Sequence, residues 1–123
     1  MSFPSSSDRK LKKNIGELEY GLDALMKLNP VSYNKKTDKA GTPKSFGFIA
    51  QETQKVISEL VTEIAEEKGT SLAITYMGFI PIAVKAIQEQ QAQIEALETR
   101  IAKLEGKPAA QKTTTRKKPY AKK

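Results

Sequence analysis

The sequence contains no cysteine and no histidine among its 123 residues. The first absence excludes disulfide bonds and thiolate metal sites. The second removes the commonest general base of hydrolytic enzymes and the commonest metal ligand, so histidine-based catalytic triads are excluded as well. Any hydrolytic chemistry must therefore depend on Ser, Thr, Lys, Asp, Glu or Tyr, and we expect neither a metal ion nor a cofactor.

Apolar residues are scarce too. Hydrophobic residues make up 38% of the chain and aromatic residues 7%, which is little for a self-sufficient domain of this size. We therefore expect partner subunits to cover part of the apolar surface. No stretch approaches the roughly 20 apolar residues of a membrane span, and the Ser-rich, then basic N-terminus does not resemble a secretory signal. These features predict a protein of intracellular origin without membrane contact.

The positive charge is concentrated at one end of the chain. Residues 107–123 contain seven Lys or Arg and no acidic residue, which leaves 14 basic against all 14 acidic groups in residues 1–106. The composition of residues 106–123 predicts a disordered basic tail. Such a tail can bind nucleic acid in a salt-sensitive way, although Tyr120 alone offers little stacking surface. A merely solubilising end is an equally good interpretation.

The first two thirds of the chain alternate short helical and β-prone segments. Leucines and Met26 at three- and four-residue spacing predict a helix over residues 18–26, which Asn29-Pro30 ends. The remaining predicted elements are a strand at 31–35, a buried strand at 46–50, a short helix at 51–57, and a hairpin of strands 61–65 and 71–75.

The last predicted element is a long helix with a heptad pattern. Pro81 suits its first turn, and no Gly or Pro occurs from Ala83 to Glu105. The two apolar heptad positions form a seam of Ile87, Gln90, Ile94, Leu97, Ile101 and Leu104, and Arg100 and Glu105 flank it. The alternative is one amphipathic helix packed on its own domain. Ile at one seam position and Leu at the other favours two strands, so the pattern predicts an oligomer with a lean towards a dimer.

The expected fold class is therefore α+β, with a small mixed head of helices and strands followed by a long coiled-coil helix. We divide the chain into residues 1–6 as a linker or remnant, 7–81 as the head, 82–105 as the oligomerisation helix and 106–123 as the tail. Only six residues precede Ser7, which we interpret as an excised domain with an added methionine rather than a stand-alone assembly module.

Three blocks of sequence carry a resemblance to a known family. The first is SDRKLKKNI at residues 7–15. The second is LNPVSY at residues 28–33, followed by FGFIAQE at 46–52. The third runs from Tyr76 through Ile80-Pro81 into AIQE at 86–89 and the heptads. In this order the blocks resemble the peptidase S74 family, the C-terminal intramolecular chaperone domain of phage tailspikes, endosialidases and related fibres.

The resemblance implies a homotrimer that holds an upstream fibre chain in register while it folds and then cuts itself off. The cut in this family lies on the N-terminal side of the serine in the first block. The implied scissile bond therefore joins Ser6 to Ser7. A lysine assists the cut, and the best match is Lys12, with Lys13 as the fallback.

The residues around Ser7 are chemically suited to such a cut. A serine hydroxyl needs a base, and a lysine serves once desolvation or neighbouring cations favour its neutral form. We assign Asp8 to orienting that lysine and Arg9 to stabilising the developing oxyanion. The alternative is a flexible linker that enters a basic first turn. For Gln51 and Glu52, an intersubunit or ester-hydrolysing role competes with a simple helix start, which we favour.

Three functions follow from these observations. The leading one is a self-cleaving serine endopeptidase of a single turnover, acting as an intramolecular chaperone in the host cytoplasm during virion assembly. The second is a permanent oligomerisation cap that stays on the fibre or tail of the virion. The third is a basic coiled-coil protein that contacts nucleic acid through residues 107–123.

Overall fold

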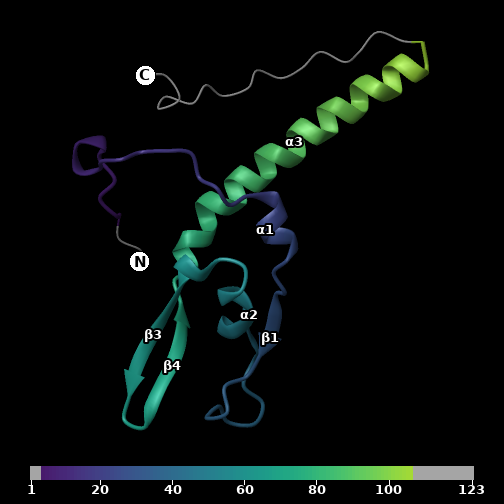
Figure 1. The fold of residues 1–123 in the computed structure, drawn as a ribbon. Coiled ribbons are helices and arrows are strands. Elements are labelled where there is room, and N and C mark those ends of the chain that lie inside the picture. The colour runs from purple at the N-terminus through teal and green to yellow at the C-terminus, as the bar shows by residue number, and fades with distance from the viewer. Residues whose placement is uncertain (1–3, 107–123) are drawn as a thin grey trace.

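The computed structural model describes residues 4–106 and shows a small mixed head from which one long helix projects (Figure 1). This arrangement confirms the predicted mixed head and long C-terminal helix. A 3₁₀ helix, Arg9–Leu11, comes first, and others lie at Ser58–Leu60 and Tyr76–Gly78. The regular elements are α1 (Leu22–Met26), β1 (Val31–Tyr33), β2 (Ser45–Gly47), α2 (Ala50–Gln54), β3 (Val61–Glu66), β4 (Gly69–Ile74) and α3 (Phe79–Leu104).

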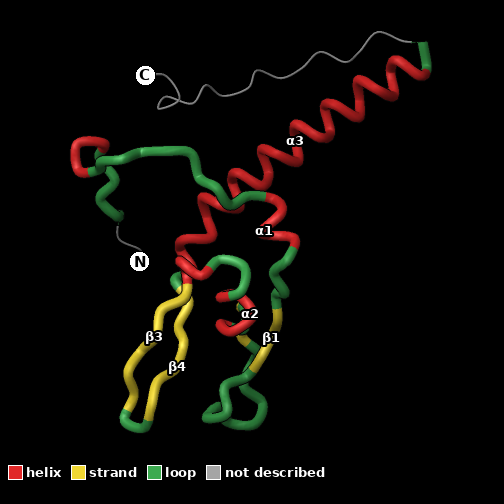
Figure 2. Tube along the Cα trace, viewed as in Figure 1, coloured by secondary structure: helices red, strands yellow, loops and turns green. Residues whose placement is uncertain are grey.

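The strands form two separate antiparallel pairs, which Figure 2 shows in yellow. In one pair Val31 of β1 lies opposite Gly47 of β2. In the other, β3 and β4 form the predicted hairpin, with Val61 opposite Ile74 and Glu66 opposite Gly69. Gly69 has a φ of +93°, a left-handed conformation that a glycine adopts without strain. Hairpin loops often end in a residue of this conformation.

The core is small and joins α1, α2 and the start of α3. Its buried apolar members are Ala24, Ile57 and Ile82, and the partly buried residues packed around them are Leu18, Tyr20, Leu25, Leu28, Val56, Leu60 and Phe79. The helix α3 is therefore part of the head at its N-terminal end, while its C-terminal half extends away from the head (Figure 1). No helix within residues 4–106 is long and apolar enough to cross a membrane.

The long helix begins earlier than the heptad pattern indicates. It starts at Phe79, directly after the 3₁₀ helix Tyr76–Gly78, and runs for 26 residues. Pro81 lies in its first turn, where a missing N–H costs little. The helix ends before Gly106, whose φ of +70° is typical of the residue that follows a helix C-cap. The predicted tail lies outside the described residues, apart from Gly106.

Two sequence predictions about the head were wrong. The leucine spacing predicted a helix from residue 18, but only Leu22–Met26 is helical, because Gly21 adopts φ −154° and ψ −136°. Leu18 nevertheless packs on the core from an extended segment. The strand at 46–50 was predicted to be buried, but β2 is shorter and Phe46 is 86% exposed. Alternate residues of a strand face opposite sides, so Phe46 faces away from the side where Tyr76 approaches Gly47.

Gly47 lies beside a cluster of aromatic rings. The rings of Phe48, Tyr76 and Phe79 contact one another, and the Phe48 backbone N–H donates to the Tyr76 hydroxyl at 3.0 Å. A Cβ at Gly47 would overlap with that hydroxyl. The close approach of β2 to Tyr76 thus requires glycine.

We expect Gly47→Ala to destabilise the head by about 1–3 kcal/mol, because the methyl group forces either Tyr76 or β2 to move. Thermal unfolding at fixed protein concentration measures this effect. Gly16→Ala is the matched control, because a Cβ there meets nothing within 4 Å; it should be neutral or slightly stabilising. Equal melting temperatures for the two variants would contradict this interpretation of the packing.

A hydrogen bond between Tyr20 and Glu59 ties the start of α1 to the segment after α2. The Tyr20 hydroxyl donates to Glu59 Oε1 at 2.7 Å. This bond lowers the pKa of the Glu59 carboxyl below its ordinary value of 4.5. The same bond is the main reason that the pKa of Tyr20 is raised above 10.0. The interaction is therefore intact when Glu59 is ionised and Tyr20 is protonated.

The sign of the pH dependence follows from these two shifts. A lowered carboxyl pKa contributes stability above its unfolded value, and this contribution is lost as the pH falls through the folded value. The raised Tyr20 pKa adds a loss at strongly alkaline pH. We expect the melting temperature of the wild type to exceed that of Tyr20→Phe by a small constant amount from about pH 5 to about pH 9. In acid the difference should vanish, and a difference that persists there would contradict the assignment. Tyr33→Phe in β1 is the control.

Candidate active site

The predicted catalytic residues lie on one short turn near the N-terminal end of the described chain. The 3₁₀ helix Arg9–Leu11 reverses the chain, so that Lys12, five positions after Ser7, returns to it. Lys12 Nζ donates a hydrogen bond to Ser7 Oγ at 2.5 Å. A general base has to lie within hydrogen-bond reach of the hydroxyl that it deprotonates, at about 2.6–3.2 Å, and the contact of this pair is slightly shorter than that range.

Asp8 stabilises the turn that brings the pair together. Its Oδ1 accepts a hydrogen bond from the Lys10 backbone N–H at 3.0 Å, and its backbone carbonyl accepts from Leu11 at 3.0 Å. Aspartate is among the preferred residues at a helix N-cap because its carboxylate satisfies a free backbone donor. The described contact of the Asp8 carboxylate is thus to the backbone of Lys10. This contact does not support the predicted role of Asp8 in orienting the Lys12 side chain directly.

The other predicted residues lie around the same turn. Arg9 is the first residue of the 3₁₀ helix and has an exposed side chain, and Lys13 follows the turn and is also exposed. Between the two lysines, the geometry favours Lys12 as the partner of Ser7. The preceding Ser6 is exposed and lies outside any helix or strand.

The whole turn is open to solvent in the single chain. Every residue from Pro4 to Glu17 is exposed, and the segment lies away from the core in Figure 1. A lysine that is to accept a proton has to be shielded from water or crowded by other cations. The single chain supplies neighbouring cations from Arg9 to Lys13, but it supplies no cover.

The predicted seam on α3 is a second feature that the single chain leaves open. Ile87, Ile94, Leu97 and Ile101 are each at least half exposed, Leu104 is 85% exposed, and Gln90 is exposed. The stripe also extends one heptad towards the head through Ile80, which the sequence analysis did not include. A continuous apolar stripe of this length on a helix that leaves its own head is typical of an interaction surface.

Gln51 and Glu52 lie in the first turn of α2, away from Ser7 in the chain. Both are exposed, and Glu52 occupies the position where a carboxylate favours the positive end of a helix. This placement agrees with the simple helix start.

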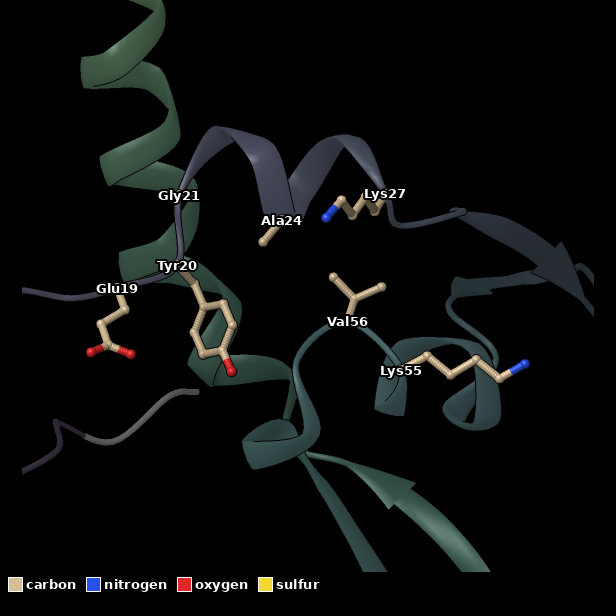
Figure 3. Close-up of a pocket in the computed structure, with 7 residues that line it drawn as sticks. All are labelled: Glu19, Tyr20, Gly21, Ala24, Lys27, Lys55 and Val56. Carbon is tan, nitrogen blue, oxygen red and sulfur yellow. The ribbon is translucent and has the colours of Figure 1, made fainter.

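A hollow of about 210 Å³ lies between α1 and the end of α2 (Figure 3). Val56 faces Ala24 across it, and the Lys55 side chain points away. It contains none of the residues predicted for cleavage. Among residues 4–106 no cluster of three acidic side chains is placed to hold a metal ion.

A comparison with protein families gives this turn its context. The model of the peptidase S74 family, described as the chaperone of endosialidase, matches residues 7–62. Residues 7–62 belong to the peptidase S74 family. The matched S74 region begins at Ser7, so it includes the Ser7–Lys12 turn, and it ends within β3.

Similarity to curated proteins extends over more of the chain than the family match does. The long tail fiber protein Gp37 of Enterobacteria phage K3 is 33% identical over 98 residues, which are 77% of this chain and 8% of that protein. Gp37 of phage T2 gives the same identity over 7% of its length. Gp37 of phage M1 is 32% identical over 97 residues, 39% of its length. The chain thus spans between 7% and 39% of the length of these fibre proteins.

Sequence reasoning missed two contacts of the segment that leads from the Ser7 turn into α1. Lys85 and Glu89 of α3 hydrogen-bond to the backbone of Leu18 and Leu22. A signal was present, because the two charges lie four positions apart on a helix face outside the heptad seam. Their targets are backbone atoms far away in the sequence, however, and no pattern of side chains identifies those.

Proposed function

We propose that this chain is an intramolecular chaperone that trimerises, holds a phage fibre or tailspike chain in register while it folds, and releases itself by cutting between Ser6 and Ser7. The observation that carries the proposal is the 2.5 Å contact of Lys12 Nζ with Ser7 Oγ. It occurs at the first residues of the S74 match. The similarity to long tail fibre proteins supports the nature of the client.

The cut proceeds in two steps in this proposal. Ser7 Oγ attacks the carbonyl carbon of Ser6, and the neutral amine of Lys12 takes the hydroxyl proton. The bond from that carbon to the Ser7 nitrogen then breaks, and the proton passes to this nitrogen, which leaves as an amine. The product is an ester between Ser6 and Ser7 Oγ. Water then hydrolyses the ester to a carboxylate on Ser6 and restores the Ser7 hydroxyl.

Arg9 and the turn itself support this chemistry. The Asp8 cap holds the 3₁₀ helix, so the distance between Ser7 and Lys12 is set before the reaction. The guanidinium of Arg9 is assigned to the oxyanion that forms on the Ser6 carbonyl. The reaction has no second substrate, so each chain acts once.

Assembly provides the missing cover. Residues 4–17 are exposed in the single chain, and packing of a second subunit on them would exclude water from the amine of Lys12. The exposed seam of α3 supplies the driving force for that association. Cutting would then wait until the subunits, and with them the fibre, have come together in the host cytoplasm.

The test is a fusion of a compact reporter of known mass ahead of Met1, examined by intact mass spectrometry and by light scattering. A break between Ser6 and Ser7 in an assembled trimer is the expected result. A fusion that assembles and folds but stays uncut would exclude self-cleavage.

A permanent oligomerisation cap is the second candidate function, in which the domain remains on the virion. The observation that favours it is that the seam lies on α3, far along the chain from the Ser7 turn, so association needs no cut. An assembled, uncut fusion is the result that would support it.

A further inference from the structure

Two charged side chains of α3 hold the backbone of the segment that leads from the Ser7 turn into α1. Lys85 Nζ donates a hydrogen bond to the Leu18 carbonyl oxygen. Glu89 Oε1 accepts a hydrogen bond from the Leu22 backbone N–H at 2.7 Å. The two residues lie one helical turn apart on one face of α3. We call this pair the clasp.

We propose that the clasp is a positioning device for self-cleavage: Lys85 and Glu89 transmit the packing of α3 to the placement of the Ser7–Lys12 turn. The inference rests on the proposed function and adds two residues to it. Neither side chain touches the reacting atoms, so both are positioning residues. Their effect on the reaction passes through the backbone of residues 13–21.

The backbone at the clasp is shaped to receive the Glu89 carboxylate. The preceding Gly21 is buried, and a Cβ there would overlap with Glu89 Oε1. Gly21 is also the N-cap of α1 and has no side chain to satisfy the free N–H groups of that helix. Glu89 supplies the missing acceptor from another element and places a negative charge at the helix N-terminus, where it is favoured.

The segment between the clasp and Ser7 has a defined path. Asn14 has a φ of 56°, a left-handed conformation uncommon outside glycine, and it changes the direction of the chain just after Lys12. Leu18 and Tyr20 pack on the core further along. The clasp holds Leu18 and Leu22, at the point where this segment joins the head. It therefore sets the direction in which the segment leads to the Ser7 turn.

The clasp and the seam share the same turns of α3. Val84 and Ile87, both at least half exposed, alternate along the chain with Lys85 and Glu89. Burying Val84 and Ile87 against a second subunit would restrain the helical turn that carries the clasp. This shared turn is a physical link by which association of the helices reaches the cleavage segment.

The first experiment measures the first-order rate of cleavage of the reporter fusion in four variants. Glu89→Ala and Lys85→Met should each slow the cut by about 10- to 100-fold, because they loosen the placement of the whole turn against the subunit that has to cover it. Glu89→Gln keeps an acceptor oxygen and should restore most of the rate. Tyr20→Phe is the matched control, because it removes a hydrogen bond of the same segment that does not involve α3, and it should cut nearly normally.

The second experiment measures coupling with the seam. Ile94→Ala weakens association without adding a charge, and it should slow cleavage in the wild-type background. Because the clasp transmits that effect, the same substitution should slow Glu89→Ala clearly less, so that the two effects are not additive. Circular dichroism measures whether each variant folds, and light scattering measures its degree of association. If Glu89→Ala does not fold, Glu89→Asp takes its place.

The outcomes are separable from those of the proposed function. A wild-type fusion that is never cut overturns the proposed function, on which the clasp depends. A wild-type fusion that is cut, with Glu89→Ala equally fast, Glu89→Gln as slow as Glu89→Ala, or strictly additive effects of residues 89 and 94, overturns the clasp alone. Slowing by Glu89→Ala, rescue by Gln and non-additivity together support it.

Discussion

Ser7→Ala and Lys12→Ala are each expected to leave a reporter fusion intact under conditions in which the wild-type fusion is cut between Ser6 and Ser7. Ser7→Ala removes the nucleophile. Lys12→Ala removes the amine that lies 2.5 Å from the Ser7 hydroxyl. Residues that act as one catalytic unit each cost nearly the whole effect when removed, so we expect a loss of at least about 10³-fold for either variant. Intact mass spectrometry over a time course measures this.

Lys13→Ala is the matched control for this prediction. It removes an adjacent lysine and the same charge, but it leaves the Ser7–Lys12 contact untouched. It should cut within a few-fold of the wild-type rate. If Lys13→Ala were the inactive variant and Lys12→Ala the active one, the assignment of the base to Lys12 would be wrong. If Ser7→Ala still produced the same fragment, the cut would come from a contaminating protease.

A charge in the apolar stripe of α3 should dissociate the oligomer. In Ile94→Asp a carboxylate replaces a side chain that is 50% exposed in the single chain and that lies at a central seam position. Removing an unpaired carboxylate from water on association costs several kcal/mol. We therefore expect a monomer at concentrations at which the wild type is assembled. Light scattering gives the number of chains directly, and it also distinguishes the trimer that family resemblance implies from the dimer that the Ile/Leu pattern favours.

Ala92→Asp is the control on the same helix. It introduces the same carboxylate two positions away, on the opposite side of the helix and at an exposed heptad position outside the seam, and should leave the oligomer intact. Because cutting depends on assembly in the proposed function, Ile94→Asp should also slow cleavage while Ala92→Asp does not. A monomeric variant that is cut at the full rate would separate the two processes and contradict assembly-timed cleavage.

The comparison of sequence and structure shows which features are local. The β3–β4 hairpin and the long α3 helix were predicted well, because strand alternation, turn residues and heptads are patterns within one segment. The turn of Ser7 and Lys12 is also local: Asp8 caps a 3₁₀ helix and brings together two side chains five positions apart.

Features that depend on distant segments were predicted poorly. Leu18 belongs to the leucine pattern but not to a helix, because the backbone at Gly21 breaks away to receive the Glu89 carboxylate from α3. Phe46 has the composition of a buried strand residue and is exposed, because β2 pairs only with β1 and its other face meets Tyr76 at Gly47. Each result was decided by a partner far away in the sequence.

The sequence by itself therefore determined residue types and their spacing: a serine five positions before a lysine, an apolar heptad stripe, and a family resemblance that the S74 match bears out over residues 7–62. Only the tertiary structure decided how these parts are joined. Lys85 and Glu89 act on backbone atoms of a segment 67 positions away. Backbone groups are the same at every residue, so a sequence carries no mark of which ones a distant side chain will bind.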